Sequence, residues 1–353
     1  MNPTRPVATI PALVISARNA MAAVALLTSS LLAPPAMAQA PADRSPSTGK
    51  TTTRFERVGV SLNPRELADG VWFVEGMAGM VSPINEGFNS NAGFVVTEDG
   101  VVVFDALGSP SLGQALLREI RKITDKPVRR VIISHYHADH FYGAQPFKEA
   151  GAEIWAQQKV IDYLATDAPT LRLAERRESL FPWVDDRARI TPPDLTFRQE
   201  VVFRLGGLTF RLIHVGPAHT PEDIMMYVEE KQVLFAGDLV FAGRVPFVGT
   251  ADSRAWLTAL DDLAERKARI LIPGHGGAST NAVDDLNLTR TYLRYLRETM
   301  GKAVQDMIPF DEAYDQADWS AFEKLPAFDD GNRRNAYNTY LRMEREALEG
   351  AKR

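Results

Sequence analysis

Half of the histidines in this chain lie within six residues. The chain has 353 residues and six histidines, and three of these stand in the segment His135-Tyr136-His137-Ala138-Asp139-His140. The segment directly follows the β-branched run at residues 131–133, which predicts a buried strand. A loop at a strand end can point alternate side chains to one side, so His135 and His137 can chelate one ion while Asp139 and His140 turn towards a second. The alternative is a polar loop that is rich in histidine by chance.

Composition narrows the chemistry that the chain can perform. It has no cysteine, which excludes disulfides, thiolate metal ligands and a cysteine nucleophile. With 40 basic and 45 acidic residues the formal net charge is −5, which offers no general positive field to a phosphate backbone. We therefore expect a small-molecule substrate and no nucleic-acid partner.

The N-terminal residues predict an export signal. Arg5 and Arg18 are the only charges before an apolar run at residues 20–33, and Ala36-Met37-Ala38 then fits the small-x-small pattern of signal peptidase. The apolar run is too short to span a bilayer comfortably, which disfavours a membrane anchor. We expect a signal peptide at 1–38, a flexible linker at 39–53, no stable membrane span after cleavage, and a periplasmic or secreted protein.

Strand and helix patterns alternate along residues 54–280 and predict one α/β domain. Strands are expected at residues 71–74, 92–96, 101–104, 131–133, 153–156, 200–205, 208–215, 224–228, 233–236 and 269–272, and helices at 112–123, 144–150 and 254–265. Residues 281–353 predict a helical C-terminal extension packed on this domain. Its apolar face is expected to contain Leu286, Leu293, Leu296, Met300, Val304 and Met307.

Three further candidate ligands each follow a predicted strand. His219 comes after residues 208–215, Asp238 after 233–236, and His275 after 269–272. Strand ends of an α/β fold converge on one rim, which is where sites are built. Each residue alone is equally compatible with a surface loop, but together with the histidine-rich segment they indicate one metal centre.

The order of these motifs resembles the metallo-β-lactamase superfamily: H-x-H-x-D-H, the His219 loop, Gly237-Asp238 and Pro273-Gly274-His275. The resemblance covers roughly residues 70–277 and implies a four-layer αβ/βα sandwich with a dinuclear metal site at one edge. It implies two Zn²⁺ per chain, with other divalent metals such as Fe or Mn as alternatives. It assigns the first metal to His135, His137 and His219, the second to Asp139, His140 and His275, and a bridging position to Asp238.

The ligand set departs from that of the lactamases themselves. Their dinuclear sites lack a bridging Asp, and one large class uses Cys at the second metal, whereas this chain has Asp238 and no cysteine. The set is more similar to glyoxalase II, to lactonases and to exported hydrolases associated with quinoprotein and sulfur-oxidation gene clusters. The tail at residues 335–341, with Glu344, is similar to that last group.

The resemblance implies a hydrolase that uses a hydroxide bridged by two metals, with Asp139 orienting the nucleophile. The expected target is an ester, thioester, lactone, amide or activated carbon–halogen bond. The alternatives are a mononuclear-iron persulfide dioxygenase, a β-lactamase, and a non-catalytic exported binding protein. The sequence leaves the substrate, the metal used in the cell and the oligomeric state open.

Several residues near the candidate ligands have a predicted role, and some of them have two possible roles. Asp105 and Asp223 are expected to hold the ligands in place by hydrogen bonds, although Asp223 also suits a turn cap. His214 lies within a predicted strand and is expected to be packed or hydrogen-bonded rather than a ligand. Arg244 either binds an anionic group or is solvated. Three aromatic residues are either pocket walls or core, namely Trp183, Phe241 and Phe247.

Overall fold

The computed structural model describes residues 55–350. The expected signal peptide at 1–38 and linker at 39–53 lie outside these described residues. Among the helices that are described, none is long and apolar enough to cross a membrane.

Two mixed sheets form the centre of the fold. The first has seven strands in the order β1-β2-β3-β4-β5-β6-β7. Its first four strands pair antiparallel, and β4 to β7 pair parallel. The strands are β1 Arg65–Ala68, β2 Val71–Val74, β3 Ala92–Thr97, β4 Gly100–Phe104, β5 Val128–Ile132, β6 Glu153–Gln157 and β7 Leu195–Phe197. The edge strands β1 and β7 were not predicted, because short strands with exposed residues carry little apolar pattern.

The second sheet has five strands in the order β12-β11-β10-β9-β8. Strands β8 to β11 pair antiparallel, and β12 runs parallel to β11. The strands are β8 Glu200–Leu205, β9 Leu208–His214, β10 Ile224–Val228, β11 Val233–Phe241 and β12 Ile270–His275.

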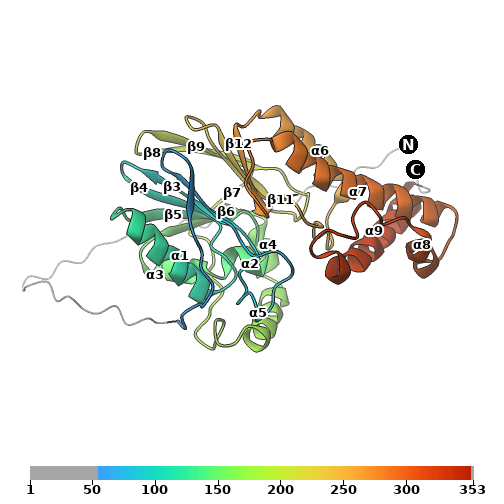
Figure 1. Ribbon diagram of the computed structural model, residues 1–353, viewed down its shortest axis with the longest axis horizontal. Coiled ribbons are helices and arrows are strands. Elements are labelled where there is room, and N and C mark those ends of the chain that lie inside the picture. Colours follow the sequence, from blue (N-terminus) through green and yellow to red (C-terminus); the bar gives the residue numbers. More distant parts are fainter. Residues whose placement is uncertain (1–54, 351–353) are drawn as a thin grey trace, which may run out of the picture. The chain divides into compact units, whose positions relative to one another are not determined.

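Helices cover the outer face of each sheet (Figure 1). The helices are α1 Pro110–Ile123, α2 Ala138–Phe141, α3 Ala144–Glu149, α4 Val160–Leu164, α5 Ala168–Ser179, α6 Ser253–Glu265, α7 Ala282–Gln305, α8 Phe310–Gln316 and α9 Phe328–Gly350. Helices α4 and α5 both lie within residues 157–190, between β6 and β7.

Alternation along the strands creates the layers. In β4, Val101 and Val103 pack against α1 and α3, whereas Val102 and Phe104 pack between the two sheets. Side chains of β11 such as Leu234 pack outwards against α6 and α7. This is the four-layer αβ/βα sandwich that the resemblance implied, and it is confirmed.

The C-terminal helices α7 to α9 continue the outermost layer (Figure 1). Leu286, Leu293, Leu296 and Met300 are buried in one cluster with Trp256 of α6, as the helical spacing predicted. Met307 was wrongly placed on this face. Helix α7 ends at Gln305, and Met307 is 87% exposed in the turn that follows.

Candidate metal centre

The first sheet delivers four candidate ligands from one short segment. His135 and His137 follow β5, and His137 is the N-cap residue of α2. Asp139 and His140 lie within the single turn of α2. The chain leaves β5 at Ile132 and enters the turn of α2 at Ala138, so four side chains within six residues can face one point.

The second sheet delivers the other three ligands from separate strands. His219 lies in the loop between β9 and β10, Asp238 lies within β11, and His275 is the last residue of β12. The expectation that Asp238 and His275 follow strands was therefore wrong. Strand β11 continues to Phe241, with an irregular ladder to β12 on both sides of Gly237.

Two glycines allow the backbone of β11 and β12 to approach the residues of the site closely. Gly237 has a φ of +55°, and a Cβ there would lie 2.7 Å from the Cβ of Ser134. At Gly274 a Cβ would lie 2.1 Å from Oδ1 of Asp238. The bulge at Gly237 and the missing side chain at Gly274 thus make room for the Asp238 carboxylate between β11 and β12.

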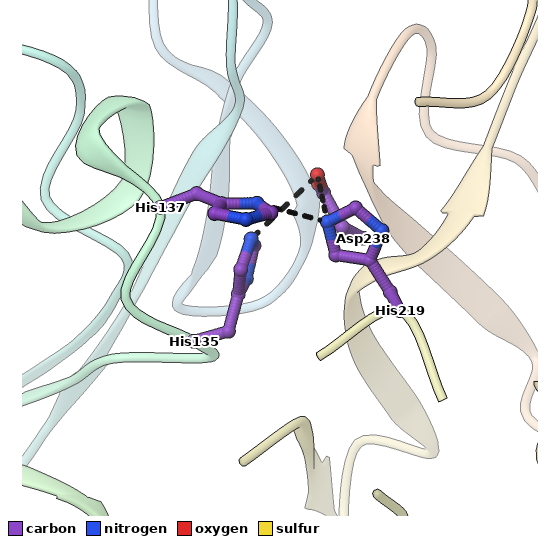
Figure 2. Close-up of side chains that lie close together, drawn as sticks. All are labelled: His135, His137, His219 and Asp238. Atoms are coloured by element: carbon purple, nitrogen blue, oxygen red, sulfur yellow. Dashed lines mark hydrogen bonds and ion pairs between the residues drawn. The ribbon is translucent and has the colours of Figure 1, made fainter. Parts of the chain in front are cut away.

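The seven residues gather into two adjacent clusters. Within each cluster the possible ligand atoms lie within 4.8 Å of one another, with His135, His137, His219 and Asp238 in one, and Asp139, His140 and His275 in the other. Figure 2 shows the first cluster, with the rings of His135 and His137 on one side and His219 on the other. The fold therefore brings together all seven residues that the sequence singled out.

Asp238 faces both clusters. Its Oδ2 lies 3.3 Å from Nε2 of His219 and 3.7 Å from Nε2 of His135. Its Oδ1 lies 3.1 Å from Nε2 of His140 and 3.3 Å from Nε2 of His275. One carboxylate oxygen is thus directed to each cluster.

The donor atoms fit divalent cations. Nε2 of His135, Nε2 of His140 and Oδ1 of Asp238 are buried and form no hydrogen bond among the described residues, even though the last two atoms lie 3.1 Å apart. Buried polar atoms are rarely left unpaired, because the loss of their hydrogen bonds to water costs free energy. Imidazole nitrogens and carboxylate oxygens are ligands that Zn²⁺ accepts, so the two clusters are consistent with a dinuclear metal site.

The pKa values of the candidate ligands also suit metal binding. Burial lowers the pKa of His135 well below its ordinary value and that of His219 to about 3, so both rings are neutral at pH 7. Burial opposes charge on Asp238, but His275 and His140 hold its pKa well below the ordinary range. Burial also opposes charge on Asp139, yet the neighbouring His140 and His275 lower its pKa to about 2.

Hydrogen bonds at Nδ1 orient three of the imidazole rings. Nδ1 of His140 lies 2.9 Å from Oδ2 of Asp105, and Nδ1 of His135 lies 2.9 Å from Oγ of Ser134. Asp105 also accepts hydrogen bonds from the backbone N–H and the hydroxyl of Ser134. Nδ1 of His275 lies 2.7 Å from the backbone oxygen of Asn89. Such bonds leave Nε2 of each ring directed at the centre.

Ser134, Asn89 and Ser90 also contact the candidate ligands, although no motif in the sequence points to these hydrogen bonds. Asn89 donates from Nδ2 to Oδ2 of Asp139 at 2.9 Å, and Ser90 donates to the backbone oxygen of Asp139. Neither contact could be found in the sequence, because about 50 residues separate these partners.

The remaining candidates lie around the clusters. Both oxygens of Asp223 accept hydrogen bonds from Thr220, so Asp223 braces the turn that carries His219. His214 is half-buried, and its Nε2 lies 2.9 Å from the backbone oxygen of Pro221. Phe241 is buried with its ring stacked on His275, and Phe247 is half-buried beside His137.

Arg244 is buried, so the prediction of a solvated side chain is wrong and the alternative, a role in binding an anionic group, stays open. It is 4% exposed, and Nη1 donates to the backbone oxygen of Gly79 at 2.8 Å. Its Nε has no hydrogen-bond partner within the described part of the chain. Burial lowers the pKa of this guanidinium from its ordinary value, although Asp238 and Asp139 oppose that change.

Comparison with known proteins places this arrangement in a family. Residues 85–275, more than half of the chain, match the family model of the metallo-beta-lactamase superfamily. The chain belongs to that superfamily. Both of its His/Asp clusters are intact, as a metal-dependent hydrolase of the superfamily requires.

Curated relatives from this superfamily include enzymes of two named kinds. The chain is 25% identical to a linear primary-alkylsulfatase of Pseudomonas sp. over 280 residues, which is 69% of this chain and 51% of that protein. It is 24% identical to the metallo-beta-lactamase IND-1 of Chryseobacterium indologenes over 210 residues, which is 57% of this chain and 79% of that protein. The chain therefore spans about half the length of the alkylsulfatase that it matches.

Solved structures share the superfamily fold. A stereoselective inverting sec-alkylsulfatase from Pseudomonas sp. has a TM-score of 0.61 at 18% identity, over 80% of this chain and 50% of that one. A metallo-beta-lactamase from Pontibacter korlensis has a TM-score of 0.51 at 22% identity, over 66% of this chain and 99% of that one.

Proposed function

We propose that this chain is a two-zinc hydrolase that cleaves an ester, thioester, lactone, amide or activated carbon–halogen bond in a small molecule. The observation that carries the proposal is the Asp238 carboxylate, with one oxygen directed to each cluster. His135, His137 and His219 would hold the first ion, Asp139, His140 and His275 the second, and Asp238 both.

Two bound divalent cations would supply an acidified water as nucleophile and a positive charge for the developing oxyanion. In the hydrolysis, the water oxygen would form a bond to the electrophilic carbon while the bond to the leaving group breaks. One proton of the water would pass to the leaving group, and the other would stay with the product that keeps the new oxygen. No serine or cysteine nucleophile is needed.

Asp139 is the residue suited to direct the attacking water. Its side chain is 23% exposed, whereas that of Asp238 is 4% exposed, so Asp139 is the more accessible carboxylate. The hydrogen bond from Asn89 fixes one of its oxygens. A pKa of about 2 keeps it ionised at neutral pH, as an acceptor for a proton of the water.

A sulfate ester is a second candidate substrate. The alkylsulfatase similarity covers 69% of the chain, which is more than the segment matched by the family model. Sulfate monoesters keep a negative charge, and the buried guanidinium of Arg244 forms no ion pair with a carboxylate of the described residues. The Arg244→Met variant should then lose turnover of p-nitrophenyl sulfate selectively, while its turnover of neutral p-nitrophenyl acetate changes little.

The test begins with the purified chain loaded with zinc and its metal content measured. Turnover is then followed for p-nitrophenyl acetate, p-nitrophenyl sulfate, a thioester, a lactone, a halogenated aromatic and a β-lactam. Asp139→Asn should lower kcat on the active substrate roughly 100-fold or more. Asp311→Asn, which changes an exposed carboxylate paired with Arg333, is the matched control and should leave kcat unchanged.

Other outcomes would replace the proposal. One iron per chain with oxygen consumption on a persulfide would indicate the dioxygenase. Turnover of the β-lactam alone would indicate a lactamase. Two bound metals with no turnover of any substrate would support the binding protein.

A further inference from the structure

The loop at residues 242–252, between β11 and α6, supplies an aromatic ring beside the metal centre. The ring centroid of Phe247 lies 5.9 Å from that of His137 and 6.2 Å from that of His219, both in edge-on geometry. Phe247 is half-buried, whereas Phe241 and Trp256, which also lie beside His219, are fully buried. Phe247 is thus the one of these three aromatic rings that a bound molecule can reach.

A single side chain from the C-terminal region holds the backbone on both sides of this ring. Asn335 of α9 accepts a hydrogen bond at Oδ1 from the backbone N–H of Val248 at 2.9 Å. Its Nδ2 donates to the backbone oxygen of Pro246 at 2.7 Å. The residues before and after Phe247 are therefore fixed by one amide group.

The amide itself cannot rotate freely. Nδ2 of Asn335 also donates to the hydroxyl of Tyr292 at 2.9 Å, and that hydroxyl donates to Oδ1 of Asn332 at 2.7 Å. Asn332 in turn donates from Nδ2 to the hydroxyl of Tyr314 at 3.1 Å. Asn332, Asn335 and Tyr292 have 0% exposure.

Such a buried polar network is costly unless every member is paired, and a simple packing role is better filled by an apolar residue. The contacts of this network outside the helices go to Pro246 and Val248, which flank Phe247. A second link joins the same loop to the C-terminal region, where the backbone N–H of Val245 donates to the oxygen of Pro326 at 3.1 Å.

We propose that Phe247 is a specificity-determining wall for an apolar group next to the scissile bond, and that Asn335 is the positioning residue that sets it. The proposal rests on the hydrolase function proposed above. It gives the C-terminal helices a role at the site, since α9 holds the substrate-facing loop without contributing a candidate metal ligand.

The first experiment compares two probes of different apolar length, p-nitrophenyl octanoate and p-nitrophenyl acetate, on the zinc-loaded chain. The measured quantity is the ratio of their kcat/KM values. Phe247→Ala should lower this octanoate-to-acetate ratio about tenfold, because an apolar contact of a few methylenes is lost. Asn335→Leu should also lower this octanoate-to-acetate ratio, roughly threefold or more, while the metal content stays unchanged.

The double variant separates positioning from general damage. If Asn335 acts through Phe247, Asn335→Leu should have no further effect on the ratio in the Phe247→Ala background. An effect of equal size in both backgrounds would overturn the proposal. Asn338→Leu is the matched control, because half-buried Asn338 lies on the same helix and makes no side-chain hydrogen bond to a described residue.

The second experiment needs no turnover. Hydrogen exchange of a peptide covering residues 242–252 should quicken in Asn335→Leu and stay unchanged in Asn338→Leu, since Val248 loses its acceptor. Unchanged exchange in Asn335→Leu would overturn the positioning role. If the Leu variant does not fold, the smaller Asn335→Ser removes the same contacts. Absence of turnover of every substrate in the panel above would contradict the proposed function, and the exchange result would still decide the role of Asn335.

Discussion

The two sheets contribute to the metal centre in different ways. The first sheet supplies His135, His137, Asp139 and His140 from six consecutive residues at one strand end. The second supplies His219, Asp238 and His275 from a loop and two strands, and the last two lie 37 positions apart. The first half of the site is local and the second half depends on the assembled sheet.

The hydrogen bonds that orient the ligands are also local in the first half of the site and long-range in the second. His135 and His140 are oriented by side chains of their own half, Ser134 and Asp105. His275 is oriented by a backbone oxygen of Asn89, which belongs to the opposite half. For His219, Nδ1 has no hydrogen-bond partner among residues 55–350. Errors in packing between the sheets should therefore affect the second half of the site more.

The largest expected effect comes from removing one ligand in each half. His135→Ala should lower activity by about 1,000-fold or more and deplete the first cluster of metal, whereas His275→Ala should deplete the second. Metal analysis and thermal unfolding of both variants check this, and both should be less stable than the zinc-loaded wild type. An unchanged metal count in either variant would remove that residue from the ligand set.

The next effect concerns the residue shared by both halves. Asp238→Asn is nearly isosteric but replaces a charged oxygen by a neutral amide that binds metal poorly, so we expect activity to fall about 100-fold and the second cluster to lose occupancy. The nucleophilic water should ionise at higher pH, which moves the acidic limb of the pH–rate profile upwards. Two metals, full activity and an unshifted limb would show that Asp238 is not a ligand.

A smaller effect is expected behind His140. Asp105 adopts a φ of +60°, which Asn tolerates better than most residues, so Asp105→Asn weakens the bond to His140 without added backbone strain. Metal affinity at the second cluster should fall about tenfold. Titration with a competing chelator measures it, and an unchanged affinity would limit Asp105 to a folding role.

The smallest effect lies away from the site, among the C-terminal helices. Glu346 pairs with Arg297, Arg254 and Arg342, and the hydrogen bond from Arg297 is the main reason that its pKa falls from 4.5 to about 2. Glu346→Gln should lower the free energy of unfolding by about 1 kcal/mol at pH 7. Because the folded pKa is the lower one, this stabilisation is present above pH 4.5 and disappears as the pH falls towards 2.

The control for this last variant is the pH dependence itself. The difference in unfolding free energy between wild type and Glu346→Gln should shrink as denaturant titrations are moved from pH 6 to pH 3. A constant difference would mean that the loss comes from packing rather than from the charge of Glu346.

The sequence determined the α/β class, most strands and the identity of all seven candidate ligands. These features are local or depend on general rules: a buried strand is a run of β-branched residues, and a histidine-rich strand end needs no distant partner to be noticed. The strand boundary at Ala236 was missed because Gly237 usually interrupts a strand, whereas here it forms a bulge that packs against Ser134.

Only the tertiary structure decided which atoms meet. The opposite directions of the two Asp238 oxygens, the contacts of Asn89 with both Asp139 and His275, and the hydrogen bonds of Asn335 to the loop of Phe247 all join different elements. Asp238 lies 19 positions from His219 and 37 from His275, and all the other partners lie 50 or more positions apart in the sequence. Residue patterns report periodicity along one element, and they carry no information on the distance between two elements. That distance is set by the packing of the two sheets and of α9, which depends on side-chain volumes and on the close approach that Gly237 and Gly274 allow.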